Sequence, residues 1–140
     1  MADRNKALDN FNKKLDSADE REVARGISIA RCAAGAMMMM APRRMARGWT
    51  GIDNDTVPTR MAMRSLGARD LAIGMGTLFA LSHRGPVRGW VEAGMLADGA
   101  DAINSLIALP NAPKARSLFW MIVSAATALT GYRISLTIDD

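Results

Sequence analysis

The chain has 140 residues, of which 49% are hydrophobic and 5% aromatic, and its formal net charge is +4. This length suits one domain, and the abundance of Ala, Met, Leu and Gly over β-branched residues predicts an all-α fold. The basic residues, fourteen Arg and four Lys, are spread over the N-terminal tail and the loops. Because they form no basic face with interleaved aromatic residues, the sequence argues against nucleic-acid binding.

The N-terminal residues 1–22 are predicted to form a polar, amphipathic segment. Leu8, Phe11 and Leu15 recur at spacings of three and four among charged and amide residues, which is typical of a short amphipathic helix. Ser17-Ala-Asp-Glu20 then matches a capping box. We therefore expect a new helix to begin there, to carry Arg31 at its centre and to end near Met40.

Residues 41–60 are predicted to be a loop, because they contain two glycines, two prolines and several polar residues. A basic cluster of Arg43, Arg44 and Arg47 stands beside Trp49, a combination that is typical of a membrane interface. Thr56 and Pro58 supply a start signal for the next helix, which we expect over residues 61–82.

The predicted helix 61–82 carries two sets of unusual residues. Small side chains recur at every fourth position and predict a face for close helix packing; they are Ala68, Ala72, Gly76 and Ala80. Arg69 lies near this stripe on a helical wheel, whereas Asp70 points elsewhere. We therefore expect each charge to find its own partner on another helix.

Two further helices are predicted, over residues 91–109 and 114–136. The first places five residues on one broad face, with two carboxylates one turn apart; they are Gly94, Asp98, Asp101, Ser105 and Ala108. The second contains an uncharged stretch from 117 to 132. Its small, weakly polar stripe again suits close packing; the stripe comprises Ser117, Ser124, Thr127, Ala128 and Gly131.

The four hydrophobic helices together predict a four-transmembrane-helix bundle over residues 23–136. Residues 23–41 offer only Arg25, Ser28 and Arg31 as polar side chains, too few for the polar face of a soluble amphipathic helix. No run of eighteen uncharged apolar residues is present, however, so a soluble helical bundle remains the alternative. Nine Lys and Arg fall on the side of the termini and six on the other side, which favours both termini in the cytoplasm.

Three stretches of the chain resemble a known family. "APRRMARGW", "RSLGARDLAIGMG" and "GWVEAGMLADGADA" resemble a family of small four-helix bacterial integral membrane proteins of unknown function, over roughly residues 23–135. The resemblance implies a multi-pass location in the bacterial cytoplasmic membrane. It brings no assigned activity.

Five charged residues come near the midplane if the helices span a membrane: Arg31, Arg69, Asp70, Asp98 and Asp101. In one interpretation they neutralise one another and hold the bundle together. In the other, a surplus carboxylate at Asp98 or Asp101 binds a proton, a cation or a cationic ligand. The sequence alone leaves both open.

The functional prediction is association within a membrane. We expect no catalytic, metal or cofactor site, because no nucleophile–base set, paired metal-ligand spacing or phosphate-binding loop is evident. The predicted function is that of an accessory or structural subunit of a membrane assembly, or of a homo-oligomer, with membrane lipid, other membrane subunits or itself as partners. The alternative is a small proton- or cation-coupled transporter that uses the midplane carboxylates.

Overall fold

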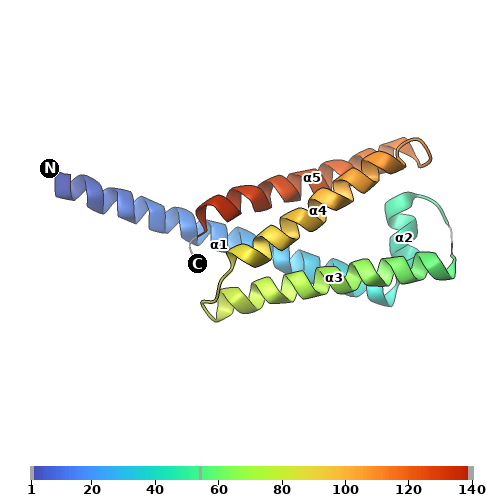
Figure 1. The fold of residues 1–140 in the computed structure, drawn as a ribbon, viewed down its shortest axis with the longest axis horizontal. Coiled ribbons are helices and arrows are strands. Elements are labelled where there is room, and N and C mark those ends of the chain that lie inside the picture. The colour runs from blue at the N-terminus through green and yellow to red at the C-terminus, as the bar shows by residue number, and fades with distance from the viewer. Residues whose placement is uncertain (1, 54, 139–140) are drawn as a thin grey trace.

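A computed structural model describes the backbone of residues 2–53 and 55–138 and the side chains of residues 19–53 and 55–138. The described chain is all-α and consists of five helices (Figure 1). In chain order they are α1 (Ala2–Met40), α2 (Pro42–Thr50), α3 (Val57–Ser82), α4 (Arg88–Ala108) and α5 (Lys114–Thr137). The all-α prediction is confirmed.

The first helix is longer than the sequence predicted. α1 is continuous from Ala2 to Met40, so the helix start expected at Ser17–Glu20 was wrong, and no backbone break marks residue 22. A capping box takes effect only where the preceding backbone leaves the helix, and no Gly or Pro interrupts the chain there. The amphipathic pattern of Leu8, Phe11 and Leu15 concerns side chains outside the described part.

A short helix occupies part of the predicted loop. α2 begins with Pro42 in its first turn and ends at Gly51, whose φ of 76° is the left-handed conformation that terminates helices. Arg116 of α5 donates a hydrogen bond to the Arg47 carbonyl at 2.7 Å. Trp120 stacks on Trp49 with ring centroids 5.5 Å apart. These contacts hold α2 against the beginning of α5.

The remaining helix boundaries lie close to the predictions. Thr56 caps α3, because its hydroxyl accepts a hydrogen bond from the Thr59 amide at 3.3 Å. α3 therefore begins at Val57, four residues before the predicted start, and α4 begins at Arg88, three residues early. The predicted start of α5 at Lys114 is confirmed.

The long helices pack as two hairpins. α1 lies along α3 and α4 lies along α5, whereas the contact between the two pairs is smaller and the pairs diverge toward the α2 end (Figure 1). α1 and α3 approach closely at two glycines: a Cβ atom on Gly67 would lie 2.6 Å from the Gly35 carbonyl oxygen. This distance leaves no room for a side chain at either position.

We expect Gly67→Val to destabilise the protein by about 1–3 kcal/mol, the range typical of overpacking. The new side chain would push the α3 backbone away from α1. Ala68→Val is the matched control, because Ala68 is the next residue and is exposed. It should cost no more than about 0.7 kcal/mol, a difference of helix propensity. The free energies of unfolding of the two purified variants in detergent measure both effects. Equal losses of stability would contradict the close contact between Gly67 and Gly35.

The core combines buried apolar residues with buried polar ones, and many large apolar side chains lie on the outside. Asp70 and Asp101 are only 7% and 6% exposed, and several buried hydroxyls accompany them. Large apolar side chains on the outside are more than half exposed; they include Met75, Phe79, Leu96, Ile103, Ile107, Phe119, Ile122 and Leu129. By length and hydropathy alone, one helical segment in the described chain, Asp19–Met40, is apolar enough to cross a membrane.

Candidate functional site

The structure brings the five predicted charged side chains together in one network between α1, α3 and α4. Arg31 comes from α1, Arg69 and Asp70 come from α3, and Asp98 and Asp101 come from α4. We call this set the ionic network. Both Arg31 and Asp70 keep no more than a tenth of their side chains exposed, so the network lies within the bundle.

Asp70 joins the two arginines of the first hairpin. Its Oδ1 accepts hydrogen bonds from Arg31 Nη1 at 3.2 Å and from Arg69 Nη2 at 3.1 Å. Each charge does find a partner on another helix, as expected: Asp70 binds Arg31 of α1, and Arg69 binds Asp101 of α4. The additional contact between the neighbours Arg69 and Asp70 was not expected. The Cβ atoms of adjacent helical residues point in different directions, but the long Arg69 side chain reaches around the helix to Asp70.

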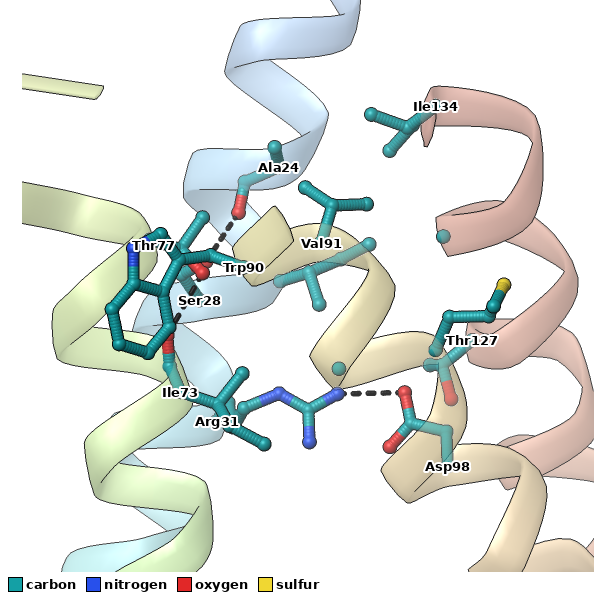
Figure 2. A pocket seen from close by; sticks show the side chains of 14 residues that line it. Ala24, Ser28, Arg31, Ile73, Thr77, Trp90, Val91, Asp98, Thr127 and Ile134 are labelled. Carbon is teal, nitrogen blue, oxygen red and sulfur yellow. Dashed lines mark hydrogen bonds and ion pairs between the residues drawn. The ribbon is translucent and has the colours of Figure 1, made fainter. Parts of the chain in front are cut away.

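Each arginine also reaches across to the second hairpin. Arg31 Nη2 donates to Asp98 Oδ2 at 2.7 Å (Figure 2). Arg69 binds Asp101 through two hydrogen bonds of 3.2 and 2.8 Å, the bidentate geometry that makes arginine–carboxylate pairs strong. Asp70 thus fixes two guanidinium groups on the first hairpin, and these hold the two carboxylates of α4.

The ionic network carries a net negative charge when all its members are ionised. Two guanidinium groups face three carboxylates, so the formal sum is 2 − 3 = −1. An uncompensated charge within a bundle is costly, and a bound proton or cation relieves that cost. The network thus has one more carboxylate than guanidinium groups.

A small pocket adjoins the network on the side of Arg31 and Asp98 (Figure 2). Its volume of about 30 Å³ is enough for a single water molecule. Ser28 and Thr127 contribute hydroxyls to its wall, and Trp90 covers it beside α3. The Ser28 hydroxyl donates to the Ala24 carbonyl at 2.7 Å, so its hydrogen-bonding capacity as a donor is used within its own helix.

A larger pocket adjoins the network on the side of Asp101, toward α2. Its volume is about 240 Å³, and we call it the α2 pocket. Trp49 and Thr50 of α2, Met63 and Leu66 of α3, and α4 residues from Asp101 to Ala108 line it, together with Ala112 and Ser117. The sequence signal for Trp49 pointed only to a membrane interface, so this role was missed.

Only half of the predicted packing stripe of α3, Gly76 and Ala80, packs within this chain. Ala68 and Ala72 are exposed, Gly76 is half-buried against Trp90, and Ala80 is buried. The structure instead packs Gly67 and Gly74 against α1. These two glycines lie seven residues apart on the face of Asp70, which is the signal that could have identified them.

Comparison of the chain with protein-family profiles, with curated proteins and with solved structures finds no match. Within the part of the chain that the structure describes, no group of three His, Cys, Asp or Glu side chains is placed to hold a metal ion. The site is thus defined by its own geometry: an ionic network with a pocket on either side.

Proposed function

We propose that this protein is a small integral membrane protein whose helices α1, α3, α4 and α5 span the bilayer and which acts by association with other subunits or with itself. The observation that carries the proposal is the large exposed apolar surface together with charged side chains buried in the bundle. Charged and hydroxyl side chains are buried between the helices, whereas Leu, Ile, Met and Phe cover the outside. Apolar surfaces of this extent belong in contact with lipid or protein.

The outer surface supports four spans. No exposed charged side chain interrupts residues 26–40, 66–81, 93–108 or 117–132, and we call these ranges the outward belt. Each is about 22–24 Å long at about 1.5 Å per residue, somewhat short of the roughly 30 Å of a typical hydrocarbon core. The inward-facing charges and hydroxyls lower the average hydropathy of α3, α4 and α5, but they do not make the outward belt more polar.

The proposed location is the bacterial cytoplasmic membrane, with both termini in the cytoplasm. The excess of Lys and Arg at the end that holds the termini favours this orientation. The resemblance to small four-helix bacterial membrane proteins belongs to the same proposal. We further propose that the protein is not an enzyme and that its partners are lipid and other membrane subunits or a second copy.

Association is supported by small residues that remain on the outside of the bundle. Ala68 and Ala72 of α3 are exposed within the outward belt. Small side chains at the surface of a membrane helix allow a neighbouring backbone to approach closely. The part of the α3 stripe formed by Ala68 and Ala72 is therefore available to a second chain.

We expect the protein, extracted in mild detergent from the membranes of the cells that make it, to migrate as a discrete complex with other membrane proteins. Native mass and identification of the co-purifying chains measure this. A pure homo-oligomer would show that the protein associates only with itself, and it would favour the transporter function discussed next. Quantitative recovery without detergent would contradict the membrane proposal.

A proton- or cation-coupled transporter is the second candidate, and one observation favours it. The pocket at Arg31 and Asp98 lies toward one end of the helices, and the α2 pocket lies toward the other. The ionic network separates the two pockets and carries the net negative charge. A cation that moves between them would pass the carboxylates of α4.

A further inference from the structure

The α2 pocket is lined mainly by apolar groups around one carboxylate. Met63, Leu66 and Ala108 contribute hydrocarbon, and Trp49 contributes an aromatic ring. Its volume of about 240 Å³ is just below the roughly 300–1,000 Å³ of pockets for drug-sized ligands. The pocket therefore suits an organic molecule of modest size better than a single ion.

The charges at the pocket select the sign of the occupant. Asp101 lines the pocket, and no Lys, Arg or His does. Arg69 compensates Asp101 through two hydrogen bonds, but with all five members ionised the ionic network has one more carboxylate than guanidinium groups. An anion would meet this surplus without a basic partner, whereas a cation would neutralise it.

The lining of the α2 pocket also favours an organic cation over an inorganic one. A bare metal cation requires several oxygen ligands that replace its water. The pocket is lined by the polar side chains of Thr50, Asp101, Asn104, Ser105 and Ser117, but most of its exposed wall is apolar or aromatic. A substituted ammonium group carries its own apolar shell and is attracted to tryptophan rings. This combination of wall and charge fits such a group.

The wall that holds Trp49 is anchored. Trp120 stacks against Trp49, and the Trp120 indole N–H donates to the Gly48 carbonyl at 3.3 Å. Arg116 holds the end of the same helix through the Arg47 carbonyl. The aromatic wall therefore stands opposite α3 and α4 before any ligand arrives, which lowers the cost of binding.

We propose that the α2 pocket binds a small organic cation of the substituted-ammonium class, with Asp101 supplying the charge and Trp49 the aromatic wall. The proposal deepens the transporter candidate but does not depend on transport, because binding is a property of the purified chain. Cation binding is also independent of the oligomeric state of the protein. Loss of binding therefore leaves the native-mass result unaffected, and the two proposals fail separately.

The test is calorimetric titration of the full chain, purified in neutral detergent, with choline and with tetraethylammonium. We expect saturable binding of at least one of them. The neutral analogue 3,3-dimethyl-1-butanol has a carbon atom in place of the ammonium nitrogen of choline. It should bind at least roughly tenfold more weakly than choline, because it lacks the charge. Absence of saturable binding by both cations, or equal binding of the neutral analogue, would overturn the proposal.

Two matched variants locate the site. Ala108→Phe fills the α2 pocket without changing any charge and should weaken binding at least roughly tenfold. Ala100→Phe is its control, because Ala100 lies on the same helix, is exposed and lines none of the pockets described above. This control should bind within about twofold of the original chain. Equal binding by both variants would place the cation elsewhere and overturn the assignment.

A second pair examines the charge. Asp101→Asn should weaken cation binding at least roughly tenfold, whereas Asp98→Asn should weaken it less, although both remove one negative charge from the network. Asp98 lines the small pocket on the other side. Equal weakening would show that only the total charge matters and would contradict a direct role of Asp101. Circular dichroism of each variant verifies that the helices remain folded.

Discussion

Arg31→Met is expected to destabilise the protein by about 3–5 kcal/mol, the cost typical of removing one partner of a buried ion pair. Arg31 alone connects Asp70 of α3 to Asp98 of α4, at 3.2 and 2.7 Å. Methionine fills a similar space but leaves two carboxylates without this partner. The free energy of unfolding in detergent, measured by chemical denaturation of the purified chain, gives the result.

An exposed arginine serves as the control. Arg43 forms an ion pair with Asp53 at 3.1 Å, but its side chain is 58% exposed. Its hydrogen bond nevertheless lowers the pKa of the Asp53 carboxyl below the ordinary value. Surface pairs contribute about 0–1 kcal/mol, so Arg43→Met should fall within that range. An Arg31→Met variant as stable as Arg43→Met would exclude a structural role for the network.

A compensating change tests the cause of the Arg31 effect. Arg31→Met leaves Asp98 without an arginine, whereas Asp70 keeps its contact with Arg69. Combining Arg31→Met with Asp98→Asn removes the charge of the carboxylate that has lost its arginine. If the loss arises from uncompensated charge, the double variant should be more stable than Arg31→Met alone. If the loss arises from packing, the two effects should add instead.

The inward faces of α4 and α5 could be predicted from the sequence because their polar periodicity is unambiguous. Of the five residues placed on one face of α4, Gly94, Asp101 and Ser105 are buried and Asp98 is partly buried, whereas Ala108 is exposed. On α5, the predicted stripe includes Ser117 and Ser124, which are also buried. In both helices large apolar residues predominate among the exposed positions, so a single orientation satisfies the pattern.

The packing face of α3 could not be chosen in this way, because two of its faces carry small residues. Ala68 and Ala72 compete with Gly67 and Gly74, and every one of these positions permits close approach. Gly67 and Gly74 form the packing face because α1 lies against them. Sequence periodicity identifies candidate faces, whereas the choice between them depends on the partner helix.

The short helix α2 was missed because its composition resembled a loop. Two arginines follow Pro42, and a glycine precedes Trp49. Yet Pro in the first helical turn and Gly just after the last are the usual boundary signals of a helix. The α2 pocket depends on this helix, since Trp49 and Thr50 form one of its walls. The five residues of the ionic network could therefore be predicted from the sequence, but the α2 pocket beside the network could not.

The environment of the outward belt determines the result of one further substitution, Ile122→Lys. Ile122 is 61% exposed and lies near the middle of the α5 part of the belt. In lipid, a lysine at the centre of a spanning helix costs about 2.5–3.5 kcal/mol. We therefore expect a large loss of membrane-integrated protein, measured as the fraction that resists alkaline extraction from membranes.

Leu136→Lys separates depth in the membrane from exposure. Leu136 is on the same helix and is also 61% exposed, but it lies beyond the belt, past Arg133. A lysine there can place its ammonium group in the interfacial water, so the cost should stay within about 1 kcal/mol. If water surrounded the bundle, both lysines would be tolerated equally, because each replaces an exposed apolar side chain. A difference between two equally exposed positions therefore requires a lipid or protein environment around the belt.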